Sequence, residues 1–429
     1  MRIASKVLIL FLVASLIIGA FGCGKEEAKT IKIGVIGPMS YVMGEHHWYG
    51  AQLAAQEIND AGGIKVGNDS YKIKLVQVDS NELFSVTDAQ SAAERAITED
   101  KVSVLMGGIR SEAVSAIQEV AMNNKVIFIG CGASDVALST KVTKDYDRYK
   151  YWFRVTPVNG TYLAGVGFQL LHMVAQEIRS ELGIMQPKVA ILAEDNVFGN
   201  TMVAAANAQI PKMGMTVVRV WQPSPNATDL TAEMSGIEAA GAQIIFTALS
   251  GPAGIPYAKK WGELQVPAAS VGINVQAQDD GFWAATSGKG NYEMTMNIYA
   301  RDVEITAKTK PFVDAFIAKK EVVPTYNAGT YDAVYILKGA IERAGSLDND
   351  AIVVELEKTD YIGTAGKLQF DQTHDVKWGP GLVTAIGVQW QDGNLVGVWP
   401  PADGSWQNVV YPGIVDYKLP PWVIAKWKP

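Results

Sequence analysis

From residue 30 onward, the chain alternates between apolar runs of strand length and segments whose apolar residues recur with a helical period. This alternation is typical of parallel sheets covered by helices on both faces, so we predict an α/β fold. Predicted strands lie at 31–37, 71–78, 102–106, 126–130, 188–193, 216–221, 244–249 and 269–273. Predicted helices lie at 44–60, 86–99, 111–124, 162–182, 199–213, 230–240, 252–264, 309–319 and 329–343. Because the pattern restarts after 152–156, we expect two doubly wound, Rossmann-like lobes.

Size and charge narrow the class of protein. A chain of 429 residues, 48% of them hydrophobic, is too long for one core and suits two compact lobes. The formal net charge is -7, and no sustained Lys/Arg cluster offsets it. The sequence therefore gives no electrostatic reason to expect nucleic acid or an anionic membrane surface as a partner.

The first residues have the pattern of a secretory signal peptide, which we assign to residues 1–22. Positive charge at Arg2 and Lys6 precedes an apolar run at 7–18, which is shorter than a membrane-spanning helix needs. The residues before Cys23 resemble a lipoprotein cleavage site, although Ala20 stands where Leu is usual. We predict that Cys23 is acylated, that 23–30 form a polar tether, and that this anchor is the only membrane attachment, outside the cytoplasm.

The patterns of common enzyme classes are missing from the sequence. The adjacent His46 and His47 show no metal-ligand spacing, so we expect a solvated pair and no metal site. There is no phosphate-binding loop for a nucleotide and no Gly-x-Ser-x-Gly nucleophile turn, so no cofactor is expected. Cys131 is expected to be a buried small residue, since no His lies near it in sequence. We predict that the protein is not an enzyme.

Two strand-to-helix junctions carry candidate binding residues. Residues 107–111 and 130–134 each combine glycines, which permit close approach, with a serine at a helix start. In a doubly wound lobe, ligands bind outside the carboxyl ends of the strands, where helix N-termini offer unpaired N–H groups. Ser111 and Ser134 are thus candidates for binding a carboxylate, and the alternative is that both only cap helices.

Several segments together resemble the periplasmic leucine/isoleucine/valine-binding family, the type I binding proteins of branched-chain amino acid ABC transporters. The resemblance rests on IGVIGPMS at 33–40, INDAGGI at 58–64, EDNVFG at 194–199 and TYDAV at 330–334, together with the two serine junctions. It implies lobes joined by three hinge crossings, one lobe at 31–155 plus 299–367 and the other at 156–298 plus 368–429. It also implies a small-molecule ligand captured by lobe closure and permease subunits as partners.

The resemblance assigns ligand-binding roles to individual residues. Ser111 and Ser134, with the backbone of Ala133, match positions that hold the ligand carboxylate. Phe198 matches an aromatic that covers the ligand, and Tyr326 matches an aromatic of the side-chain pocket. For both, ordinary packing is the alternative interpretation.

Other positions depart from the family pattern. Met43 stands where an aromatic is usual, Leu249 replaces another aromatic, and Arg110 replaces a small residue and could bind a carboxylate. Asn274 aligns with the acidic partner of the ligand ammonium, so leucine is expected to bind weakly. The ligand class therefore stays open among amino acids, amides and plain carboxylates.

The C-terminal tail differs from the rest of the chain in its tryptophan content. Tryptophans gather in the tail, at 378, 390, 399, 406, 422 and 427. We expect these rings to pack the tail across a lobe, and the alternative is an aromatic ligand platform.

Two alternative functions of the protein stay open. One is a ligand-sensing receptor module of the same fold, which would be expected to carry a signalling domain, and the other is a secreted hydrolase.

Overall fold

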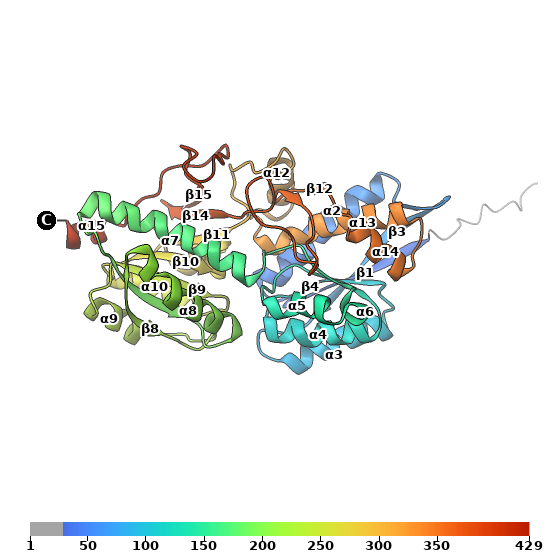
Figure 1. Ribbon diagram of the computed structural model, residues 1–429, viewed down its shortest axis with the longest axis horizontal. Coiled ribbons are helices and arrows are strands. Elements are labelled where there is room, and N and C mark those ends of the chain that lie inside the picture. Colours follow the sequence, from blue (N-terminus) through green and yellow to red (C-terminus); the bar gives the residue numbers. More distant parts are fainter. Residues whose placement is uncertain (1–28, 429) are drawn as a thin grey trace, which may run out of the picture.

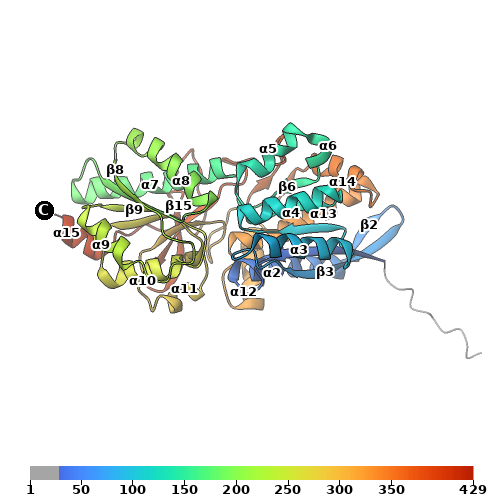
Figure 2. The ribbon, with the colours of Figure 1, turned by 90° about the horizontal axis from the view of Figure 1, so that it is seen from below.

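The computed structural model describes residues 29–428, which form two α/β lobes side by side along the long axis of the molecule (Figures 1 and 2). Each lobe is built on its own sheet, and helices cover both faces of each sheet. The predicted fold class is confirmed. The assignments of a signal peptide at 1–22, of an acylated Cys23 and of nearly all the tether lie outside the described residues.

The first lobe contains a six-stranded sheet in the order β2-β3-β1-β4-β5-β6. Its strands are β1 (Thr30–Gly37), β2 (Ile64–Val66), β3 (Asp69–Asp79), β4 (Val104–Gly107), β5 (Ile127–Gly130) and β6 (Trp152–Arg154). All neighbours pair in parallel except the β2–β3 hairpin, and Ile33 of β1 lies between Leu75 and Val104. Every residue of β4 and β5 is buried, as expected for central strands covered on both faces.

Helices from two separate parts of the chain cover this sheet. The first set is α2 (Val42–Asp60), α3 (Val86–Thr98), α4 (Ser111–Asn123), α5 (Val136–Lys144) and α6 (Tyr146–Tyr149). The second set is α12 (Thr309–Lys320), α13 (Thr330–Ala344) and α14 (Asn349–Leu356). Helices α12 and α13 pack against α2, so a segment distant in sequence completes the first lobe (Figure 1).

The second lobe contains a seven-stranded sheet in the order β15-β14-β11-β10-β9-β7-β8. Its strands are β7 (Lys188–Ala193), β8 (Thr216–Trp221), β9 (Ile244–Leu249), β10 (Ala269–Asn274), β11 (Met294–Asn297), β14 (Ile386–Gln391) and β15 (Asn394–Trp399). Its helices are α7 (Gly160–Leu182), α8 (Val197–Gln209), α9 (Thr231–Ala239), α10 (Gly254–Leu264), α11 (Gly281–Ala285) and α15 (Pro421–Trp427). Short 3₁₀ turns are η1 (Pro211–Met213), η2 (Val275–Gln278) and η3 (Tyr326–Gly329).

The chain passes between the two sheets three times. It leaves the first sheet after β6 and enters α7, whose N-terminus is capped by the side chain of Asn159. It returns between β11 and α12, and crosses again between the small hairpin of β12 (Tyr361–Ile362) and β13 (Lys367–Leu368) and strand β14. We propose that the two lobes correspond to 31–155 plus 299–367 and 156–298 plus 368–429.

The tail is more regular than its sequence suggested, because β14 and β15 form a hairpin that extends the second sheet. The two-residue turn, Asp392 and Gly393, has positive φ at both positions, as a type I′ turn requires. Beyond it, the indole N–H groups of Trp422 and Trp427 donate to the carbonyls of Val266 and Pro267. The tail tryptophans therefore anchor the tail to the second lobe.

The expectation of a solvated histidine pair is wrong. His46 is 1% exposed, and its Nδ1 accepts the N–H of Thr325 at 2.9 Å, while His47 Nε2 lies 3.0 Å from the carbonyl of Cys131. Burial lowers the pKa of His46 to about 3 and that of His47 to about 4. Both rings are therefore neutral packing elements between α2 and its neighbours. Cys131 itself is fully buried, as expected.

Within the part of the chain that the structure describes, none of the helices combines the length and apolar character that crossing a bilayer requires.

Candidate functional site

A cavity of about 220 Å³ lies where the carboxyl ends of the strands of the two lobes face each other. This is the position that a pair of doubly wound sheets provides for a ligand. The first lobe and the first crossing contribute Leu83, Ile109, Arg110, Ser111, Glu112, Gly132, Ser134, Pro157 and Tyr326. The second lobe contributes Leu163, Asp195, Asn196, Phe198, Pro225, Asn226, Ser250, Gly251, Pro252, Ile273, Val275 and Met296.

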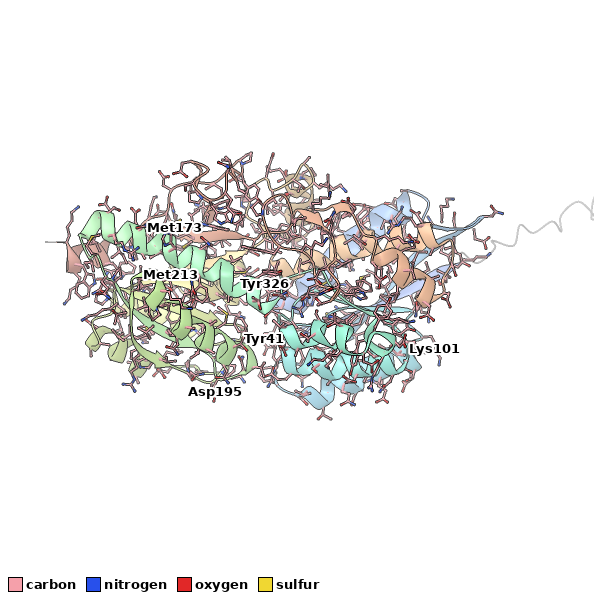
Figure 3. The ribbon with its side chains drawn as sticks, viewed as in Figure 1. Tyr41, Lys101, Met173, Asp195, Met213 and Tyr326 are labelled. Atoms are coloured by element: carbon pink, nitrogen blue, oxygen red, sulfur yellow. The ribbon has the colours of Figure 1, made fainter. Side chains whose placement is uncertain are left out.

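Three hydroxyl groups of the first lobe have no hydrogen-bond partner among the described residues. They belong to Ser111, Ser134 and Tyr326, whose exposed fractions are 6%, 7% and 5%. Burial raises the pKa of Tyr326, so its phenol stays protonated and can donate. Figure 3 shows Tyr326 at the junction of the two lobes. Because these hydroxyls belong to residues that line the cavity and are not engaged by described residues, they are available to hydrogen-bond a polar ligand group.

The loops that carry the serines fit closely together. A Cβ atom added at Gly132 would clash with the carbonyl of Gly108, so only glycine allows the two junctions to touch. Ser111 is the first residue of α4, and Ser134 lies in the loop before α5. The sequence thus brings two hydroxyls from separate strands to one wall of the cavity.

The buried carboxylate of Glu82 holds the loop that precedes Ser111 in place. Oε2 of Glu82 accepts the N–H groups of Ile109 and Arg110, both at 3.0 Å, and Oε1 accepts the hydroxyl of Ser80 at 3.1 Å. Burial raises the pKa of Glu82 to about 7, although these hydrogen bonds act in the opposite direction. Glu82 therefore positions the loop that precedes Ser111.

The second lobe repeats this device with Glu194. Its Oε1 accepts the N–H of Gly251 at 2.6 Å, and its Oε2 accepts the hydroxyl of Ser250 at 2.7 Å. Asn196 donates to the same carboxylate at 3.0 Å and caps α8 by accepting the N–H of Gly199. Burial raises the pKa of Glu194. The loops after β7 and β9 are thereby tied together along the cavity.

The rest of the wall combines apolar and polar side chains. Phe198 on α8 and Leu83 and Ile109 of the first lobe contribute apolar surface, as do Ile273 and Val275 at the end of β10. Asn226 and Ser250 of the second lobe add polar groups. Such a mixed wall suits a small ligand that carries polar groups beside an apolar part.

Two carboxylates line the cavity, and they differ in their bonding. Glu112 Oε1 accepts the N–H of Val197 at 3.2 Å, and its Oε2 lies 3.4 Å from Nε of Arg110. Arg110 also donates to the carbonyl of Leu83 at 3.3 Å. The Asp195 carboxylate, by contrast, forms no hydrogen bond with a described residue. Asp195 is therefore the cavity carboxylate that is free to meet a ligand.

Of the nine residues predicted from the sequence, the structure brings five to the cavity, and Ala133 is buried between two residues that line it. The five are Arg110, Ser111, Ser134, Phe198 and Tyr326. Arg110 is engaged with Glu112 and Leu83, so its guanidinium is not wholly available for a carboxylate.

The remaining three predicted residues lie away from the cavity, and their placement is a correction. Asn274 is fully buried and its Nδ2 donates to the Gly254 carbonyl at 3.1 Å and to Glu293 at 3.2 Å, because adjacent residues at a strand end point to opposite faces. Leu249 packs in the core of the second lobe. Met43 is fully buried on α2, where Gln276 contacts its sulfur at 3.8 Å.

Sequence reasoning did not select several cavity residues. Asn196 belongs to the EDNVFG segment at 194–199, whose position after a strand is the signal that could have found it. Glu112 follows Ser111 directly but resembles an ordinary first-turn acid of a helix. Ser250 and Gly251 directly follow β9, and from the sequence we selected Leu249, the last residue of that strand, in their place.

No group of three or more His, Cys, Asp or Glu side chains within residues 29–428 is arranged to hold a metal ion.

Two α/β lobes that enclose a cavity at the ends of their strands define the class of two-lobed solute-binding proteins. The family model described as periplasmic binding protein matches residues 30–391. Leu/Ile/Val-binding protein homolog 3 of Brucella melitensis is 25% identical over 382 residues, which cover 88% of this chain and 96% of that protein. The chain belongs to the periplasmic binding protein family, whose members include the Leu/Ile/Val-binding proteins, so the resemblance seen in the sequence is confirmed.

Solved structures show the same fold. The branched-chain amino acid transporter substrate binding protein LivJ of Streptococcus pneumoniae, in complex with isoleucine, has a TM-score of 0.72 and 23% identity, covering 86% of this chain and 98% of that chain. An ABC transporter solute binding protein of R. palustris, in complex with benzoate, has a TM-score of 0.69 and 18% identity. The match covers 86% of this chain and 95% of that chain. These relatives bear the names of binding proteins.

Proposed function

We propose that this protein is the extracytoplasmic substrate-binding lipoprotein of an ABC importer of the branched-chain amino acid type. It captures a small amino acid, amide or carboxylate by closing its lobes. The observation that carries the proposal is the interlobe cavity, in which the hydroxyls of Ser111, Ser134 and Tyr326 have no partner among residues 29–428.

The chemistry of the cavity supports this assignment. Hydroxyls can donate to a carboxylate or amide oxygen, and hydrogen bonds to a charged group are the stronger kind. The apolar part of the wall then takes the body of the ligand, and Phe198 covers it from the second lobe. Since residues of both lobes line the cavity, a ligand that touches both favours the closed arrangement.

The partners follow from the family and from the sequence. In this proposal the acylated Cys23 holds the protein at the membrane, and the closed form docks on the permease subunits of the importer. ATP hydrolysis belongs to separate subunits, because the sequence contains no phosphate-binding loop. The protein itself catalyses no reaction.

Two measurements test the proposal. Native mass spectrometry of purified protein should show a bound small molecule, and its release should yield a compound with a carboxylate or amide end. Calorimetry with that compound should give one site, and a ligand at 100 times its dissociation constant should stabilise the fold by about 2.7 kcal/mol. Chemical conversion of the released compound by the pure protein would contradict the proposal and favour a hydrolase.

A further inference from the structure

A hydrogen bond crosses the cleft beside the cavity. Glu112 lies in the first turn of α4 in the first lobe, and Val197 is the first residue of α8 in the second lobe. The Glu112 carboxylate accepts the Val197 N–H at 3.2 Å, and the two helices contact each other here. The neighbours Ser111 and Phe198 both line the cavity, so this contact lies at its edge.

The N–H of Val197 needs a partner from outside its own helix. The first N–H groups of a helix have no intrahelical acceptor, and a carboxylate near them also meets the positive end of the helix dipole. Asn196 caps α8 at Gly199, so its side chain does not serve Val197. The acceptor for Val197 comes from the opposite lobe, and separating the lobes would return this N–H to water.

Arg110 holds the carboxylate in place. Its Nε lies 3.4 Å from Glu112 Oε2, and its Nη1 donates to the Leu83 carbonyl at 3.3 Å. The side chains of Arg110 and Glu112 are 32% and 27% exposed, so the pair is partly shielded from water. Glu112 is therefore pre-oriented by its own lobe before it reaches the other one.

We infer that Glu112 is a closure residue, which stabilises the closed arrangement of the lobes by accepting the Val197 N–H across the cleft. The inference rests on the proposed function, in which a ligand stabilises a closed arrangement that the ligand-free protein already populates in part. Because Val197 is 40% exposed and the bond is open to water, we expect it to shift the ratio of closed to open molecules by roughly threefold. Loss of this bond would also speed ligand release, because opening precedes release.

A double-mutant cycle tests the inference without any ligand. Glu112→Ala removes the acceptor, and Val197→Pro removes the donor. Proline is tolerated at the first helical position, and Asn196 already has the extended backbone that the residue before a proline requires. Glu119→Ala on the same helix is the matched control, because Glu119 pairs with Lys141 and Arg148 inside the first lobe. Small-angle X-ray scattering of protein stripped of ligand by unfolding and refolding reports the closed fraction.

We expect each single variant to lower the closed fraction to the same extent, the double variant to lower it no further, and Glu119→Ala to match the wild type. Two results would overturn the inference: scattering by Glu112→Ala identical to that of the wild type, or effects of the two substitutions that simply add. Because no ligand enters this experiment, failure to find a ligand for the wild type would count against the proposed function and not against the role of Glu112.

Discussion

Arg154 and Asp375 form a buried ion pair that joins the first and third crossings between the lobes. Arg154 Nε lies 3.3 Å from Asp375 Oδ1, and the two side chains are 0% and 2% exposed. Arg154 also donates to the carbonyl of Ser134 at 3.1 Å, which connects the ion pair to the wall of the cavity. Asp375 accepts the Asn159 amide at 3.0 Å, beside the start of α7. One pair thus supports both the connection of the lobes and the position of a candidate binding residue.

Removing one partner of this pair should be severe. Asp375→Ala removes the carboxylate paired with a fully buried guanidinium and leaves only Asp135 and Asp371 as nearby negative charges, so we expect the free energy of unfolding in denaturant to fall by about 3 kcal/mol. Asp360→Ala is the control, because its ion pair with Lys367 lies at the surface and should contribute less than about 1 kcal/mol. Equal losses in the two variants would show that the buried pair has no special role.

The serine junctions show what the sequence could predict about the site. Each junction consists of a buried strand, two or more glycines and a hydroxyl at a predicted helix start. Because parallel strands end at the same edge of a sheet, this pattern predicts that the two hydroxyls lie at that edge. That local pattern placed Ser111 and Ser134 at the cavity. The alternating pattern of apolar segments likewise predicted most helices and strands of both lobes, although it missed α5, β11 and the hairpin of β14 and β15.

The errors have physical causes too. Asn274 was chosen by alignment, but one residue of offset in a strand turns a side chain to the opposite face, and its neighbours Ile273 and Val275 line the cavity instead. The tail hairpin lacks an alternating pattern because every residue of β14 is buried. Its turn residues, Asp392 and Gly393, were the available signal.

Loss of a cavity hydroxyl should weaken binding. Ser111→Ala and Ser134→Ala should each raise the dissociation constant of a carboxylate ligand by the equivalent of about 1–3 kcal/mol, because a charged oxygen loses a donor. Calorimetry with the compound released from the native protein measures the change. Ser180→Ala, an exposed serine on α7, is the control and should bind like the wild type. Unchanged affinity in both cavity variants would reduce these serines to structural residues of their loops.

Asp195 should decide whether the protein distinguishes amines. The expectation that leucine binds weakly depended on Asn274, which lies outside the cavity, whereas the unpartnered Asp195 carboxylate lines it. If the ligand carries an ammonium group, Asp195→Asn should weaken its binding roughly tenfold, the loss of a charge-assisted bond. The deaminated acid of the same skeleton should bind the wild type and Asp195→Asn equally.

Calorimetry with isoleucine and its deaminated acid makes the comparison, and Asp229→Asn on the exposed surface of the second lobe is the control. Equal losses for the two compounds would exclude Asp195 as an ammonium partner.

Membrane attachment should depend on Cys23. If the mature chain begins at an acylated cysteine, Cys23→Ala should move the protein from the membrane fraction to the soluble fraction of cells. Cys131→Ala is the matched control, because Cys131 is fully buried and cannot carry an anchor. Membrane association that survives Cys23→Ala would refute the anchor.

The stability of the second lobe should respond to pH through Glu293. This side chain is fully buried, its Oε2 has no partner among the described residues, and burial raises its pKa to about 7 from the usual 4.5. Between these two values the folded chain binds more protons than the unfolded chain, so the contribution of Glu293 to stability falls as pH rises from about 4.5 to 7. Glu293→Gln removes this titration, so the free energy of unfolding of the variant relative to the wild type should rise by on the order of 2 kcal/mol between pH 5 and pH 8. Urea unfolding at the two pH values measures the difference, with the exposed Glu238→Gln on α9 as the control. A difference between Glu293→Gln and the wild type that stays constant with pH would show that Glu293 is ionised in the folded protein throughout this range.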